Sequence, residues 1–145
     1  MGTITVRDIN IHPLKKIKVP GGDVLHGMKQ SDPGYAGFGE AYFSWVSIEA
    51  VKAWKRHTQM TMNVVVPVGK VRFVFRCVNS EDVEEFRVEE IGEDRYVRLT
   101  VPPGIWFGFQ GLGTPQSLVM NIASIPHDPN EVERILLSDI NYKWS

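Results

Sequence analysis

The residues best suited to chemistry gather in one short segment, AVKAWKRHTQM, at positions 50–60. Lys52, Lys55 and Arg56 stand there beside His57. An imidazole titrates near neutral pH, so His57 is suited to take a proton from a substrate. Lys55, as an ammonium, is suited to stabilise a negatively charged oxygen or to bind a phosphate. The segment therefore suggests a site for proton transfer or for anion binding.

Strand parity decides which of these side chains share a wall. If the segment is extended, Lys55 and His57 point to one face, while Lys52 and Arg56 point to the other. A wall that faces the mouth of a barrel would form a binding site. If that face is exposed to solvent, the segment would be an edge strand of the sheet, whose charged side chains discourage pairing with other chains. The pattern alone leaves both interpretations open.

The rest of the chain predicts the elements that must position this segment. Turn signals rich in glycine and proline recur at short intervals, and strand-length runs separate them. These runs either alternate apolar and polar residues or are rich in β-branched and aromatic residues. They lie at 42–47, 62–68, 71–77, 95–101 and 117–123. Only the short segment 130–139 could easily form a helical turn. Many short strands at this spacing predict an all-β sandwich, jelly roll or barrel.

Composition narrows the setting. A chain of 145 residues that is 43% hydrophobic is expected to form a single domain over 1–145. A formal net charge of −1 gives no global argument for nucleic acid or for an anionic membrane as a partner. Cys77 is the only cysteine, and neither a signal-peptide pattern nor a long apolar run is present. We therefore expect a cytoplasmic protein with no membrane partner.

Four segments together resemble a known family: AVKAWKR at 50–56, VVVPVGKV at 64–71, VPPGIWFGFQGL at 101–112 and PNEVERILLSDINYKW at 129–144. From about Gly21 to Trp144 the chain resembles the cupin jelly rolls that act on nucleotide sugars, above all the dTDP-4-dehydrorhamnose 3,5-epimerases. The resemblance implies a cupin-type jelly roll (double-stranded β-helix), a nucleotide-sugar substrate, and a role in deoxysugar or surface polysaccharide biosynthesis. It also implies a homodimer, and the N-terminal TITVR is expected to form a strand that has no partner within the chain.

The catalytic positions of the epimerases are largely substituted here. The resemblance places the family's basic histidine at Lys55 and its acidic tyrosine at about Asn121. Phe107 replaces a later histidine, and Lys52 replaces the arginine that grips the nucleotide phosphate. The aspartate that orients the histidine is kept as Asp139.

One histidine survives close by. The related dTDP-sugar 3,4-ketoisomerases carry R-G-F-H-A-H, which fits KAWKRH and makes His57 the counterpart of the second histidine. We therefore expect His57 as the base, Lys55 as the electrophilic partner of the enolate oxygen, and Asp139 as the group that orients one of them. The acid is open among Tyr42, Tyr96 and Tyr142. Residues expected to bind the substrate are Lys52, Lys70, Arg72, Trp106, Phe107 and Asn121.

Other interpretations of these residues stay open. His57 can equally be a structural histidine in a degenerate pocket, and Trp106 and Phe107 can belong to the barrel core or to a dimer contact. Metal-binding cupins use H-x-H and a third histidine, where this chain has K-x-H and Phe107, so we expect neither a metal nor a cofactor. The leading function is a dTDP-4-keto-6-deoxyhexose epimerase. The alternatives are a 3,4-ketoisomerase and a non-catalytic binding module.

Overall fold

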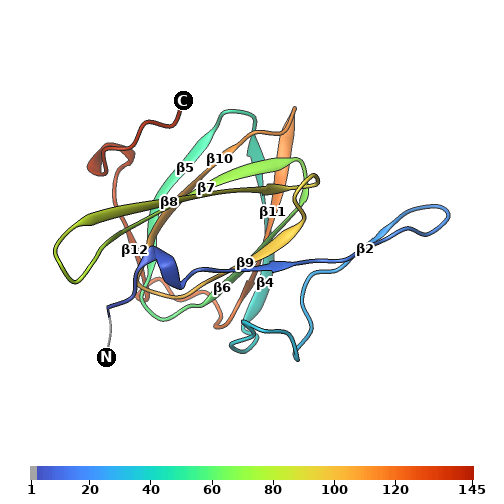
Figure 1. Cartoon of the computed structure of the whole chain (residues 1–145), viewed down its shortest axis with the longest axis horizontal. Helices are drawn as coiled ribbons and strands as arrows, with labels where there is room; N and C mark the ends of the chain where they lie inside the picture. The colour runs from blue at the N-terminus through green and yellow to red at the C-terminus, as the bar shows by residue number, and fades with distance from the viewer. Residues whose placement is uncertain (1–2) are drawn as a thin grey trace.

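Two five-stranded antiparallel sheets face each other and hold the main hydrophobic core between them in the computed structural model, which describes residues 3–145 (Figure 1). The first sheet contains, in order, β1 (Asn10–Pro13), β9 (Val97–Val101), β6 (Met62–Val68), β11 (Gln116–Ala123) and β4 (Glu40–Ser47). The second sheet contains, in order, β12 (Val132–Arg134), β5 (Val51–His57), β10 (Trp106–Gly111), β7 (Lys70–Val78) and β8 (Glu84–Gly92). The chain passes repeatedly from one sheet to the other, which confirms the predicted cupin-type jelly roll.

The remaining elements are small. Strands β2 (Lys16–Ile17) and β3 (Val24–Leu25) form a hairpin that projects from the sheets at the right of Figure 1. Two 3-10 turns, η1 (Val6–Asp8) and η2 (Leu137–Asp139), lie near the ends of the chain. Among residues 3–145, no helix has the length and hydropathy needed to cross a membrane.

The alternation predicted for 71–77 builds one wall of the core. Val71, Phe73, Phe75 and Cys77 of β7 are buried between the sheets, whereas Arg72 points to the outer face. Phe73 and Phe75 are at most 2% exposed. Burial of a side chain of this size contributes about 1.5–3 kcal/mol, so the inner row of β7 holds the second sheet against the first.

A second apolar cluster lies on the outer face of the second sheet. Trp54, Val74 and Ile140 are buried there, beneath a C-terminal segment that includes Tyr142 and Trp144. The indole nitrogen of Trp54 donates a hydrogen bond to the carbonyl of Leu137 at 3.1 Å. The C-terminal segment is therefore packed against the back of β5.

One local prediction holds only in part and another is wrong. Within 130–139 the expected helical turn is confined to η2 at its end, while Val132–Arg134 form β12, which pairs with β5. The segment TITVR, residues 3–7, forms no strand, since Val6 begins the turn η1 and is buried, with its amide donating to the Cys77 sulfur. The first strand is β1, which pairs with β9.

Candidate active site

Two cavities between the sheets share a wall made by β5. The larger measures about 450 Å³ and the smaller about 290 Å³, and both are lined by Tyr42, Lys55 and Arg134. Strand β5 lies between β12 and β10 rather than at an edge. The edge-strand interpretation is therefore wrong, and Lys55 and His57 form a cavity wall.

His57 lies in the wall of the smaller cavity with one ring nitrogen bound and the other free. Its Nδ1 is 2.5 Å from Oε1 of Glu131, and both side chains are buried. Its Nε2 is buried and has no hydrogen-bond partner among the described residues. The ring stacks on Phe107, with centroids 6.0 Å apart. If Nδ1 carries the proton, Nε2 keeps a lone pair, as a general base requires.

Glu131 is fixed by several hydrogen bonds at the start of β12. Its Oε2 accepts from the backbone amides of Gln59 and Met60 at 3.1 and 3.2 Å. Its backbone carbonyl accepts from the amide and the hydroxyl of Thr58, both at 2.8 Å. The turn that follows β5 therefore holds the carboxylate against the imidazole. Nothing close to His57 in the sequence indicates Glu131, because 74 positions separate the two residues.

The electrostatics of the pair favour a neutral imidazole beside an ionised carboxylate. Burial lowers the pKa of His57, the hydrogen bond that its imidazole donates to Glu131 acts to raise that pKa, and the nearby cations Lys55 and Arg134 lower it further. Burial acts to raise the pKa of Glu131, but hydrogen bonds from His57, Gln59 and Met60 outweigh it and lower that pKa. Glu131 therefore accepts the Nδ1 proton, and His57 is poised as a base at neutral pH.

Lys55 lies next to this pair on the same wall and lines both cavities. Burial lowers the pKa of Lys55 most, the cations Arg134 and Lys52 lower it further, and the Glu131 carboxylate opposes them in part. Lys55, Lys52 and Arg134 line the larger cavity, and no carboxylate does so within the part of the chain that the structure describes. The larger cavity is therefore suited to an anionic ligand.

Solved structures of sugar-nucleotide enzymes are similar to this chain. A dTDP-sugar isomerase from Desulfovibrio desulfuricans G20 is 35% identical, with a TM-score of 0.90 over 96% of this chain and 92% of that one. The chain belongs to the dTDP-sugar isomerase family. It is therefore an enzyme of the sugar-nucleotide isomerase and epimerase type, and the alternative of a non-catalytic binding module is set aside.

More distant structures show the same fold. A dTDP-4-dehydrorhamnose 3,5-epimerase from Bacillus anthracis str. Ames, solved with TDP and pyrophosphate, is 15% identical, with a TM-score of 0.77 over 94% of this chain and 84% of that one. A sugar 3,4-ketoisomerase from Thermoanaerobacterium thermosaccharolyticum, solved with TDP, is 16% identical, with a TM-score of 0.74 over 90% of each chain. These likenesses show the shared jelly-roll fold. No protein-family model matches the chain, and no curated protein does.

A bulge in β5 places Lys52, a predicted substrate-binding residue, in the wall of the larger cavity. Along β10, Phe107 pairs with Lys55 and Phe109 pairs with Lys52, because Trp54 has no partner where the register shifts. Residues opposite each other share a face, so Lys52 lies on the same face as Lys55. Simple alternation, which places them on opposite faces, is wrong here. Lys52 lines the larger cavity, and its Nζ donates to the backbone carbonyl of Trp45 at 2.8 Å.

The predicted role of Asp139 is not supported by its contacts. Its Oδ2 accepts a hydrogen bond from the Leu136 amide at 2.8 Å within the turn η2, and the residue is exposed. Glu131 holds the imidazole instead. Asp139 was expected to orient either His57 or Lys55; its side chain is bonded within η2 instead, and the group that orients His57 is corrected to Glu131.

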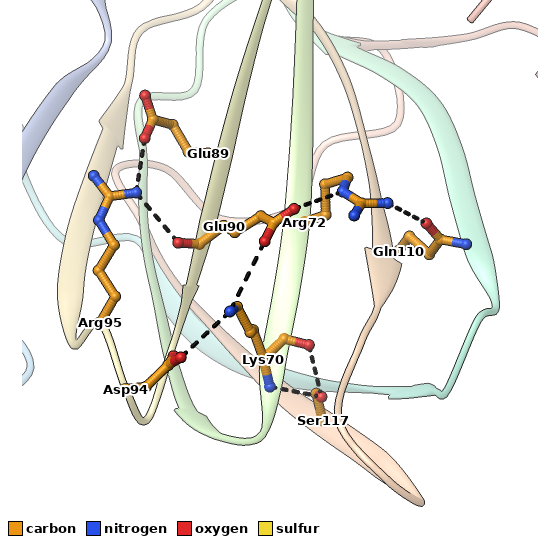
Figure 2. Close-up of polar contacts among 8 residues, drawn as sticks. All are labelled: Lys70, Arg72, Glu89, Glu90, Asp94, Arg95, Gln110 and Ser117. Atoms are coloured by element: carbon orange, nitrogen blue, oxygen red, sulfur yellow. Dashed lines mark hydrogen bonds and ion pairs between the residues drawn. The ribbon is translucent and has the colours of Figure 1, made fainter. Parts of the chain in front are cut away.

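Lys70 and Arg72 do not line either cavity, which corrects their prediction as substrate-binding residues. Figure 2 shows that they lie in a network of ion pairs on β7 and its neighbours. Arg72 donates to Glu90 at 2.9 Å and to Gln110 at 3.1 Å. Lys70 lies 3.8 Å from Glu90 and 3.3 Å from Asp94. Their charges are already paired on the outer face of the second sheet.

The predicted aromatic and amide contacts divide between two places. Phe107 lines the larger cavity and stacks on His57, and Asn121 lines the same cavity. Trp106 lies on the outer face, where the Arg56 guanidinium is 4.7 Å from its ring centroid. The prediction that Trp106 stacks on the substrate is therefore wrong. Among residues 3–145, no group of three or more His, Cys, Asp or Glu side chains is arranged to hold a metal ion.

Proposed function

We propose that this enzyme is a dTDP-4-keto-6-deoxyhexose epimerase that acts by removing a proton next to the keto group. The observation that supports it is the His57–Glu131 pair in the cavity wall beside Lys55. A neutral imidazole in this arrangement can take a proton from a carbon, because Glu131 stabilises the imidazolium that forms.

Lys55 supplies the second requirement of this chemistry. When the proton leaves the carbon next to the ketone, negative charge moves to the keto oxygen. The Lys55 ammonium, half-buried on the same wall, is suited to donate a hydrogen bond to that oxygen. A donor placed at such an oxygen contributes about 10²–10³ in rate in other enzymes.

The larger cavity fits the nucleotide part of the substrate. Lys52 and Arg134 line it together with apolar side chains such as Phe109 and Val119. The two cations are suited to the diphosphate, and the apolar surface is suited to a base or a sugar face. We propose that dTDP lies in the larger cavity and the keto sugar in the smaller one.

A 3,4-ketoisomerase is the second candidate. His57 stands at the place of the second histidine in the ketoisomerase motif, and it lines the smaller cavity. Both reactions begin with loss of a proton from the carbon next to the ketone, so they share the base and the oxyanion donor. They differ in where the proton returns.

We also propose that the enzyme is a homodimer. Phe43 and Trp45 point outward from β4, an edge strand of the first sheet, and are 61% and 51% exposed. Large exposed apolar side chains on an edge strand are suited to pack against a second copy of the chain at a dimer interface. Light scattering is expected to give twice the mass of the chain, and Phe43→Ser with Trp45→Ser is expected to give the monomer mass. A wild-type monomer at micromolar concentration would contradict this proposal.

The proposed setting is deoxysugar or surface polysaccharide biosynthesis in the cytoplasm. The only cysteine, Cys77, is a buried free thiol, which fits a reducing compartment. Cell fractionation checks the location. Loss of a deoxysugar from surface polysaccharide after gene deletion checks the pathway.

The decisive experiment is hydrogen exchange in deuterated water. The protein is incubated with dTDP-4-keto-6-deoxyglucose, and loss of the C3 and C5 proton signals is followed by NMR. We expect exchange that is lost in His57→Ala and kept in the matched control His26→Ala, because His26 lines neither cavity. Exchange that persists in His57→Ala would refute the base assignment. The product then separates an epimerase from a ketoisomerase.

A further inference from the structure

The proposed reaction also needs an acid that returns a proton to the sugar, and one tyrosine lies where that acid is required. Of the three candidates named from the sequence, Tyr96 donates its hydroxyl to the His26 carbonyl at 2.6 Å. Tyr142 packs on the outer face against Trp54 and Phe86. Tyr42 lines both cavities, and it is the only tyrosine that does so among the residues described.

Tyr42 is the direct neighbour of the position where the family resemblance expects a tyrosine. That position falls at about Asn121, on β11. In the antiparallel pairing of β11 with β4, Asn121 and Tyr42 stand opposite each other. The amide nitrogen of Asn121 donates to the Tyr42 hydroxyl oxygen at 3.0 Å. The phenol of Tyr42, on the neighbouring strand β4, therefore lies next to the position where the family has a tyrosine and this chain has Asn121.

The hydrogen bond from Asn121 leaves the proton of Tyr42 available. The Asn121 amide nitrogen also lies 3.7 Å from the Met60 sulfur, which can only accept, so the nitrogen is the amide atom that faces both groups. The Tyr42 oxygen accepts one hydrogen bond, and its own hydrogen has no acceptor among the described residues. The hydroxyl is therefore free to donate into the cavity. The same Asn121 donation stabilises the oxygen after its proton has left.

The base and this hydroxyl lie on opposite walls. His57 belongs to β5 of the second sheet and Tyr42 to β4 of the first sheet, and both line the smaller cavity. A sugar ring held between the sheets has the imidazole on one face and the phenol on the other. A proton removed on one face and returned on the other inverts the carbon, which is what an epimerase must do.

We propose that Tyr42 is the catalytic acid, a role transferred from β11 to β4, and this inference rests on the proposed function. His57 Nε2 takes the proton from the carbon beside the ketone, and the C–H electrons form the enolate double bond as charge moves to the oxygen near Lys55. The enolate then re-forms its C=O bond and takes the Tyr42 hydroxyl proton on the opposite face. The phenolate regains a proton from water, and His57 releases its proton to water.

The test compares exchange with inversion in Tyr42→Phe, using dTDP-4-keto-6-deoxyglucose in deuterated water. We expect inverted product to form about 10²–10⁴-fold more slowly, while deuterium exchange at the same carbon stays within about threefold, because His57 can still remove and return the proton on its own face. The control is Tyr142→Phe, which removes a hydroxyl from the outer cluster and is expected to change neither rate.

Several outcomes overturn the inference. Unchanged inversion in Tyr42→Phe shows that another group is the acid. Equal loss of exchange and inversion, with TDP binding intact, shows that Tyr42 positions the substrate instead. A wild type that neither exchanges nor inverts any 4-keto sugar refutes the proposed function itself, and the inference falls with it.

A second variant tests the transfer between strands. Tyr42→Phe combined with Asn121→Tyr returns a hydroxyl from β11 to the same part of the cavity. We expect inversion to recover at least tenfold over Tyr42→Phe alone. No recovery in a variant that is folded and binds TDP would show that position 121 cannot place an acid in this cavity, and would overturn the proposed transfer.

Discussion

Replacing Glu131 with glutamine should disable His57 by moving its proton to the wrong nitrogen. The backbone amides of Gln59 and Met60 both donate to Oε2 of Glu131, so a glutamine at this position must place its carbonyl oxygen there. Its NH₂ group then faces Nδ1 of His57, which has to accept. The imidazole proton moves to Nε2, and the lone pair needed by the substrate is lost.

The hydrogen bonds set the size of the effect. Turning the glutamine amide around restores the productive tautomer but leaves the two buried amides of Gln59 and Met60 without an acceptor. Each such loss costs about 1–3 kcal/mol, so the productive arrangement is disfavoured by about 2–6 kcal/mol. Since 1.36 kcal/mol is tenfold in rate, we expect exchange to fall at least about 30-fold.

The assay is the rate of deuterium incorporation into dTDP-4-keto-6-deoxyglucose, with ¹⁵N NMR of histidine to identify the protonated ring nitrogen. Glu133→Gln is the matched control, because Glu133 is two residues away and pairs with Arg56 on the surface. Far-UV circular dichroism and TDP binding establish that the variant is folded. Exchange within about threefold of wild type, or an imidazole still protonated at Nδ1, would refute this reasoning.

Other perturbations test separate parts of the structure. Because Lys55 lowers the pKa of His57, Lys55→Met should raise that pKa and move the acid limb of the kcat/KM profile, which lies below about pH 6.5 in the wild type, to higher pH; a shift to lower pH would contradict this sign. Arg134→Ala should weaken TDP binding about 5–30-fold by calorimetry, whereas Lys70→Ala, an ion-paired residue, should leave it unchanged; equal effects would contradict the placement of the diphosphate. Trp54→Ala should lower the free energy of unfolding by about 3–5 kcal/mol in urea, because its buried indole is central to the outer cluster; a loss below about 1 kcal/mol would contradict that role.

The fold was predictable because it depends on local patterns. Alternating runs and turn signals indicate the strands without knowledge of their partners, as with the inner row of β7. The segment 130–139 was predicted only in part. Its residues permit a helical turn, which forms at η2, but pairing of β12 with β5 overrides that local preference over Val132–Arg134.

The site was predictable only in part. His57 and Lys55 share a segment, so their common wall follows from spacing once the strand is known to face inward. Lys52 was misplaced because a single unpaired residue in β5 reverses parity, and nothing in the sequence fixes where a bulge falls. Lys70 and Arg72 were predicted to bind phosphate because the sequence does not show that Glu90 of β8 pairs with both of them (Figure 2). Glu131 depends on a contact that no local pattern records.

The separation of His57 from Glu131 also bears on how the enzyme is made. During synthesis β5 leaves the ribosome well before β12, and domains form as their segments emerge. All strands of the two sheets except β12 precede Glu131 in the chain, so they can assemble around an imidazole that still lacks its carboxylate. Strand β12 is only three residues long and adds to β5 at the edge of its sheet. Docking of this short strand brings the Glu131 carboxylate to His57. A nascent or nicked chain without β12 would therefore form the barrel but would lack a functional catalytic base.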